Sequence, residues 1–160
     1  MKKIVLFLLL AAMFCVSFAY ALDSKILNTR DALIKESADI KALLTTKTKD
    51  PVIISGLFNT CLITATQLDA YFLMLGIFEA AKKEGCPGNE GIKFIVSWLN
   101  EIRNTSTLNI ENINAITQAE PKTKVEIGKL RATLISLSAL IDIELNKFSI
   151  IAQSAKKTKK

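Results

Sequence analysis

The stretch PKTKVEIGKLRATLISLSALIDIELNKFSIIAQSA, residues 121–155, decides the fold class because it holds the clearest helical pattern in the chain. Apolar side chains recur along it at alternating spacings of three and four, which is typical of one face of a packed α-helix. They are Ile127, Leu130, Leu134, Leu137, Ile141, Phe148 and Ile151. Glu144 interrupts this line, and Leu145 supplies an apolar neighbour. A second line, Val125, Ile143 and Ile150, predicts that the helix contacts neighbours on two sides.

The segment over residues 51–84 is a second long helix with very little charge. Asp69 is the only charged residue between Pro51 and Phe78, so a membrane span is one interpretation. Polar side chains interrupt the apolar run, and this favours a helix buried on most sides of a bundle. The expected buried stripe is Leu57, Cys61, Ala65, Leu68, Phe72 and Leu75. It loses phase at Gly76, which predicts either a kink or end there, or last turns that project beyond the core.

The rest of the chain predicts further helices and short connections. Residues 22–48 form an amphipathic first helix, and Asp50-Pro51 supplies a cap and first residue for the second. A breaker over residues 85–88 precedes a third helix over residues 89–104, after which Asn and Thr residues predict an interruption and a weak helix or loop to residue 119. The sequence therefore predicts an all-α fold, an up-down bundle of four or so helices.

The first 21 residues have the three parts of a secretory signal. Lys2 and Lys3 precede an apolar run over residues 4–18, and Ala19-Tyr20-Ala21 is an A-x-A cleavage site. The run is short for a membrane anchor, so cleavage after Ala21 is favoured over a retained anchor. We therefore expect a signal peptide over 1–21, one helical-bundle domain over 22–155 and a basic tail over 156–160. The protein is expected in the periplasm or secreted.

Positive charge is concentrated at the two ends of the chain. The sequence has 21 Lys and Arg, 15 Asp and Glu, and no His, for a net charge of +6. Six lysines at the ends account for the excess: Lys2, Lys3, Lys156, Lys157, Lys159 and Lys160. The neutral body argues against a nucleic-acid-binding face. The absence of His excludes the common active sites that use an imidazole as an acid, as a base or as the activator of a nucleophile, and the common His-containing zinc sites. We therefore predict no enzyme, catalytic residue, cofactor or metal site.

Cys61 and Cys86 are the cysteines of the expected mature chain, and an oxidising compartment would favour a disulfide between them. Along one straight helix the two would lie roughly 37 Å apart, whereas a bridge needs Cα atoms within about 7 Å. A disulfide therefore requires the chain to reverse near Gly76. The alternative is two separately buried thiols.

Three single residues and the basic tail carry the remaining candidate contacts. Asp69 stands among apolar neighbours, which suggests a ligand or partner contact with a raised pKa, or alternatively an exposed acid satisfied by Lys or hydroxyl groups. Tyr71 and Trp98 could line a pocket, although aromatic residues at such spacings more often belong to the core. The tail lysines could contact an anionic surface, or form a solvated end that complements the helix dipole. Those lysines are Lys156, Lys157, Lys159 and Lys160.

One short region has a recognisable pattern, made of Tyr71, Gly76, Glu79-Ala80, Cys86-Pro87 and Trp98-Leu99. This pattern resembles that of the small periplasmic immunity proteins of interbacterial toxin systems. It spans about thirty residues, while the position of Cys61 and the long C-terminal helix depart from the family pattern. The resemblance implies an immunity-type inhibitor as an alternative function, and no residue role is transferred.

These features predict an exported, non-enzymatic helical protein that acts through contacts with an unidentified protein partner or with itself. Surplus apolar lines on the second and last helices suggest surface left for such contacts. A carrier of a small apolar ligand held between the helices is a second alternative. Contact with nucleic acid is not expected, and contact with membrane would be at most peripheral.

Overall fold

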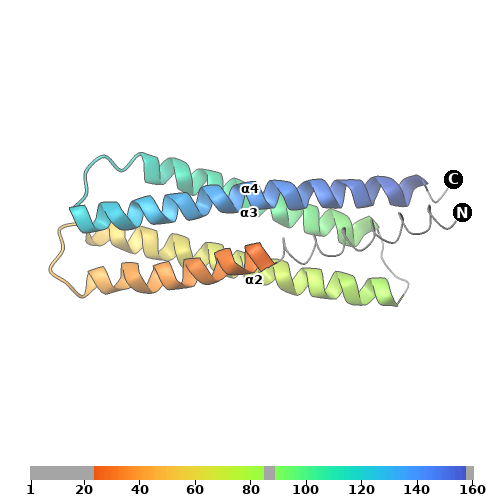
Figure 1. Ribbon diagram of the computed structural model, residues 1–160, viewed down its shortest axis with the longest axis horizontal. Helices are drawn as coiled ribbons and strands as arrows, with labels where there is room; N and C mark the ends of the chain where they lie inside the picture. Colours follow the sequence, from red (N-terminus) through yellow and green to blue (C-terminus); the bar gives the residue numbers. More distant parts are fainter. Residues whose placement is uncertain (1–23, 85–88, 158–160) are drawn as a thin grey trace, which may run out of the picture.

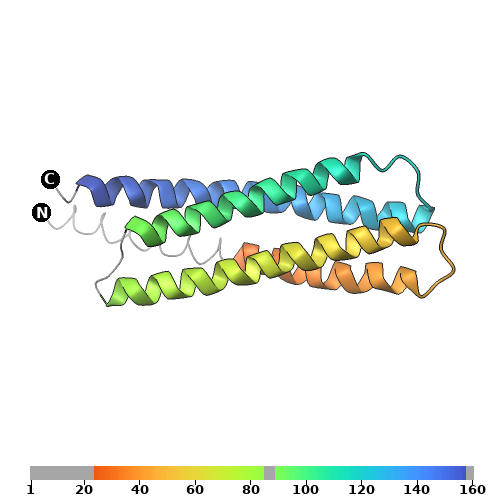
Figure 2. The same ribbon diagram turned by 180° about the vertical axis from the view of Figure 1, so that it is seen from behind.

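The chain forms an all-α, up-down bundle of four helices in the computed structural model, which describes residues 24–84 and 89–157. A first helix over residues 24–44 is followed by α2 (Pro51–Lys83), α3 (Asn89–Asn114) and α4 (Pro121–Lys157), each antiparallel to the one before (Figures 1 and 2). The predicted signal peptide, Cys86, Lys159 and Lys160 lie outside the described residues. Lys156 and Lys157 belong to the α4 backbone, and their side chains also lie outside the description.

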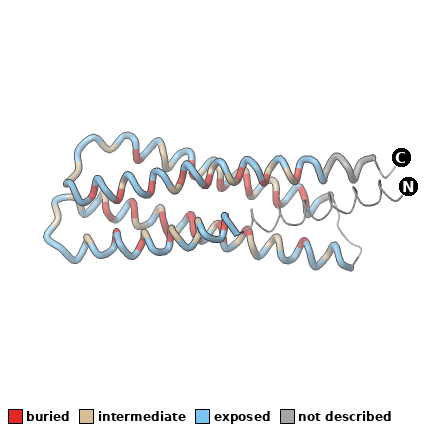
Figure 3. Tube along the Cα trace, in the orientation of Figure 1, coloured by how far each residue is buried: buried red, intermediate tan, exposed pale blue. Residues whose placement is uncertain are grey.

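Buried residues recur at spacings of three, four or their sum along each helix, as bundle packing requires (Figure 3). On α2 the recurring buried residues are Ile54, Leu57, Cys61, Thr64, Leu68, Tyr71 and Phe78, with Leu75 partly buried between the last two. The predicted stripe is confirmed at Leu57, Cys61, Ala65 and Leu68, which are buried. Its last two members, Phe72 and Leu75, are only partly buried, and Tyr71 takes the inward position instead of Phe72. Thr64, a polar residue outside the predicted stripe, is also fully buried.

Gly76 neither ends nor interrupts α2, which runs as one helix to Lys83. The apparent loss of phase arose from following the wrong line of residues, because Phe78 lies one heptad after Tyr71 and continues the buried line. The Phe78 ring packs edge-on against Phe148 of α4, with ring centroids 6.1 Å apart. It also lies against α3, since a Cβ added at Gly91 would be 3.2 Å from Phe78 Cδ2. The core therefore extends past Gly76.

The predicted interruption after Asn104 is also absent, because α3 continues to Asn114. Ser106 lies fully buried in the line between Ile102 and Ile113, so packing against the bundle holds this turn in the helix. The Thr107 hydroxyl bonds the carbonyl of Arg103 at 3.0 Å, within the helix. Tertiary packing thus outweighs the weak helix propensity of this Asn- and Thr-containing stretch.

The connection before α2 differs from the predicted cap. The first helix ends at residue 44 rather than at Thr48, and the hydroxyls of Thr45 and Thr46 bond carbonyls three residues back. Pro51 is the first residue of α2, as predicted, but the Asp50 side chain does not cap it. The Asp50 carboxylate instead accepts a hydrogen bond from the backbone N–H of Glu120, immediately before α4.

The second apolar line of α4 lies on the exposed side of the helix rather than in the core. Val125 and Ile143 are exposed, while the first line is buried from Leu130 to Phe148. Glu144 lies in the first line between Ile141 and Phe148, and its side chain is fully buried. Among α2, α3 and α4, the most extensive packing is between α3 and α4. At Glu144 a carboxylate faces the core in place of an apolar side chain.

Candidate functional site

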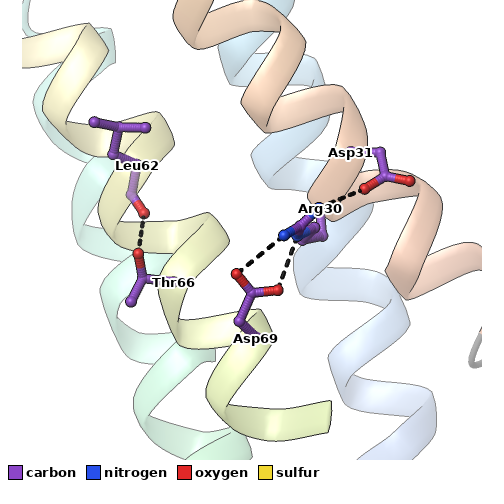
Figure 4. Close-up of polar contacts among 5 residues, drawn as sticks. All are labelled: Arg30, Asp31, Leu62, Thr66 and Asp69. Carbon is purple, nitrogen blue, oxygen red and sulfur yellow. Dashed lines mark hydrogen bonds and ion pairs between the residues drawn. The ribbon is translucent and has the colours of Figure 1, made fainter. Parts of the chain in front are cut away.

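Asp69 lies on the exposed surface, where it pairs with Arg30 of the first helix. Arg30 Nε and Nη2 donate to the two carboxylate oxygens of Asp69 at 2.8 and 3.2 Å, and Arg30 Nη1 donates to Asp31 at 2.9 Å (Figure 4). These hydrogen bonds, first the one to Asp69, raise the pKa of the Arg30 guanidinium above its ordinary value. Asp69 is thus satisfied by an arginine, and this pair joins α2 to the first helix.

Tyr71 is fully buried and forms part of a polar network in the core. Its hydroxyl donates to Glu144 Oε1 at 2.9 Å, and Lys147 Nζ donates to the same oxygen at 2.7 Å. The other carboxylate oxygen, Glu144 Oε2, is buried without a hydrogen-bond partner. We expect this network to orient α2 against α4, because its members come from both helices.

Trp98 is half-buried, and its indole N–H donates to the backbone carbonyl of Gln67 at 3.0 Å. The polar groups of the three predicted contact residues therefore have three different partners: Arg30, Glu144 and the carbonyl of Gln67. The structure does not join them through these contacts into one site. Each connects α2 to a different neighbour in the bundle.

Two further acids near the core escaped the sequence analysis. Glu36 of the first helix accepts a hydrogen bond from the Thr133 hydroxyl at 2.7 Å, and Glu126 of α4 pairs with Lys129 at 2.9 Å. Each carboxylate keeps a second oxygen, Oε2, that is buried without a partner. The sequence signal that could have identified Glu36 and Glu126 is an acidic residue at the helical spacing of the buried apolar residues. The same signal marks Glu144. No group of three or more Cys, Asp or Glu side chains suited to a metal ion occurs in the described residues.

Glu36 should make the stability of the fold depend on pH. Burial raises the pKa of its carboxyl above the ordinary value, against the smaller opposing effect of the Thr133 hydrogen bond. A carboxyl with a raised pKa in the folded state favours folding below its unfolded pKa, and that contribution is lost as pH rises through the folded pKa.

We therefore expect Glu36→Gln to be more stable than the unmodified protein at about pH 7 and close to it at about pH 4. Glutamine keeps an oxygen that can accept the Thr133 hydroxyl, so the change removes mainly the charge. Urea unfolding at both pH values measures this difference. The exposed Glu101→Gln is the control and should show no such pH-dependent gain; an equal gain in both variants would rule out burial as the cause.

Cys61 is a free thiol buried in the core. Burial raises the pKa of this thiol to about 12, with a further contribution from the charge of Glu36. The reversal near Gly76 on which a bridge to Cys86 depended is absent, because α2 is continuous from Pro51 to Lys83. Cys86 itself lies outside the described residues.

Cys61 is expected to resist alkylation in the folded protein. Iodoacetamide reacts with the thiolate, so a buried thiol with a raised pKa should react at least about tenfold more slowly in the native state than in concentrated guanidinium. Peptide mass spectrometry after timed quenching measures the modification of Cys61. Without reductant, full alkylation of Cys61 on unfolding is expected; an unmodified Cys61 under those conditions would contradict a free thiol.

The side of α2 opposite its buried line forms an uncharged surface, which we call the outer α2 face. Its exposed members are Val52, Gly56, Asn59, Ile63, Thr66, Leu73 and Ile77. They also recur at spacings of three and four or their sum, so they lie along one side of the helix. Asp69, the one charged residue in this part of α2, lies to one side of that line. By length and composition α2 could cross a membrane, and only 33% of its most apolar window is buried in the bundle.

Comparison with known proteins adds no assignment to this site, because no family model, no curated protein and no solved structure shows a significant match to the chain.

Proposed function

We propose that this is an exported, non-enzymatic helical-bundle protein that acts through protein–protein contacts made by its outer α2 face. The observation that carries the proposal is the combination of large exposed apolar side chains and absent charge on that face. Ile63, Leu73 and Ile77 are each more than half exposed. An uncharged surface with large exposed apolar side chains, on a helix that already packs through its opposite side, is typical of a protein interface.

The size of the outer α2 face suits a modest interface. It extends from Val52 to Ile77, and 25 helical residues rise by roughly 37 Å. Stable complexes bury about 800 Å² on each partner, so this single helix would supply the centre of an interface rather than all of it. The contact is therefore proposed either between two copies of this chain or with another protein.

The proposal includes export. The signal-like residues 1–21 support cleavage after Ala21, with a periplasmic or secreted mature protein. Mass measurement of the protein recovered from a host with an export pathway tests this part. A mature mass that begins at Leu22 is the expected result, and a full-length mass in the membrane fraction would contradict cleavage.

The interface is tested by light scattering and by binding of a hydrophobic dye. We expect the mass of the purified protein to rise with concentration, or the monomer to bind the dye through the open face. The double change Ile63→Lys and Leu73→Lys should suppress both signals without lowering stability, because both side chains are exposed. The matched control is Ile143→Lys, which puts the same charge on an exposed apolar position of α4. A monomer at high concentration that binds no dye would contradict the proposal.

A further inference from the structure

The connections before α2 and before α4 lie at the same end of the bundle (Figures 1 and 2). Hydrogen bonds join the two connections. Glu120 Oε2 accepts from the Thr48 hydroxyl at 2.9 Å and from the backbone N–H of Lys49 at 3.1 Å. In the other direction, the N–H of Glu120 donates to Asp50 Oδ2 at 2.6 Å. Each acid of these connections is thus occupied by donors from the opposite connection, and the loops hold one another in place.

A pocket of about 390 Å³ lies between these connections and the start of α4. Its lining includes Thr46, Lys47, Thr48, Glu120, Lys122 and Thr123. Lys47 lies in the connection before α2 and Lys122 in the first turn of α4. Both are exposed, and neither has an ion-pair partner in the part of the chain that the structure describes. Two ammonium groups without an ion-pair partner among the described residues therefore lie beside the same pocket.

Thr123 is the least ordinary residue of this pocket. It is only 1% exposed, and its hydroxyl has no hydrogen-bond partner among the described residues. The other two threonines that line the pocket are different, since Thr46 bonds the Leu43 carbonyl and Thr48 bonds Glu120. Thr123 Oγ1 is not among the buried side-chain atoms that lack a partner, so the hydroxyl is open to the pocket that Thr123 lines, where it can donate to a bound acceptor.

The start of α4 adds further donors in the same place. Lys124 makes the first intrahelical bond, from its N–H to the Glu120 carbonyl at 2.9 Å, and the Glu120 N–H is held by Asp50. The N–H groups of Lys122 and Thr123 precede that first bond, and helix geometry leaves them without an intrahelical acceptor. The positive end of the α4 dipole lies here as well, and it favours an anion.

We propose that this pocket binds a phosphate group, held by Lys47, Lys122, the first N–H groups of α4 and the Thr123 hydroxyl. The Glu120 carboxylate lines the pocket and opposes an anion, but it already accepts two hydrogen bonds from the facing connection. The two connections and the first turn of α4 together hold four lysines, at 47, 49, 122 and 124, against the acids Asp50 and Glu120, which is an excess of two positive charges. A phosphate has several acceptor oxygens and suits donors that converge from a loop and a helix end.

Two-dimensional NMR of the purified chain tests the proposal with inorganic phosphate as the probe, at constant ionic strength set with chloride. We expect the amide signals of Lys122 and Thr123 to shift and saturate. Thr123→Val removes only the hydroxyl and should weaken binding by about tenfold, the effect of losing one hydrogen bond to a charged group. The double change Lys47→Gln and Lys122→Gln, at exposed positions, tests the site independently of the buried residue.

Lys35→Gln on the first helix is the matched control, because Lys35 is exposed, has no ion-pair partner among the described residues and lies ten residues before the first connection. It should leave binding unchanged. A second arm uses vesicles of phosphatidylcholine mixed equally with phosphatidic acid. Saturable binding of free phosphate that the variants weaken supports a soluble phosphate ligand, and vesicle binding alone that the variants weaken supports a lipid headgroup. Absence of saturation in both arms, or equal loss in Lys35→Gln, overturns the proposal.

Discussion

Replacing Phe78 with alanine is expected to lower the free energy of unfolding by about 3 kcal/mol. The ring is only 8% exposed and fills the space between Gly91 of α3 and Phe148 of α4. Truncation removes this apolar contact and leaves a cavity at the end of the bundle opposite the two tied connections. Urea unfolding followed by far-ultraviolet circular dichroism measures the loss.

The neighbouring residue supplies the control for this prediction. Ile77 is 62% exposed on the outer α2 face, so Ile77→Ala should change stability by no more than about 0.5 kcal/mol. Both changes introduce the same helix-favouring residue, and helix propensity therefore cannot explain a difference between them. Similar small losses for both variants would show that the core ends near Gly76.

Replacing Lys147 with methionine should have a comparably large effect through a different mechanism. The change leaves the fully buried Glu144 carboxylate with the Tyr71 hydroxyl but without its ammonium partner. Removing one member of a buried ion pair costs about 3 to 5 kcal/mol. Because the Lys147 side chain is 31% exposed, water screens part of this interaction, and we expect a loss of about 2 kcal/mol.

A second change separates charge from packing. Glu144→Gln in the Lys147→Met background removes the buried charge and keeps an oxygen for the Tyr71 hydroxyl, so it should restore most of the lost stability. The control is Lys93→Met, because the Glu90–Lys93 pair has the same spacing and the same 2.7 Å contact but side chains 83% and 71% exposed. That variant should change stability by no more than about 0.5 kcal/mol. A failure of the Gln variant to restore stability would mean that Lys147 acts through its packing.

Much of the architecture could be predicted from local sequence patterns. Which residues of α2 point into the core could not. The apolar line of α4 lies in the core from Leu130 to Phe148, and Pro51 begins α2 as its position after Asp50 indicates. On α2, however, apolar residues occur on all sides, so Phe72 and Tyr71 were equally suited to the inward position. A helix without a polar side has no rotational preference of its own.

The candidate site shows the same division. The exposed position of Asp69 follows from no local pattern, since its partner Arg30 lies 39 residues away. The occupied loop acids Asp50 and Glu120 belong to connections 70 residues apart, and the sequence indicated only that Asp50 precedes a helix. Distant partners of this kind are set by how the helices associate, which near neighbours in the chain do not encode.

The sequence by itself determined the all-α class and the start of the helix at Pro51, because helical periodicity and the proline act within a few residues. Only the tertiary structure decided which α2 residues face inward, that Ser106 stays helical, and that Glu144 meets Tyr71 across 73 residues. The reason is physical. Helix formation depends on local spacing, whereas the rotation of each helix depends on the total packing and hydrogen bonding that its neighbours offer.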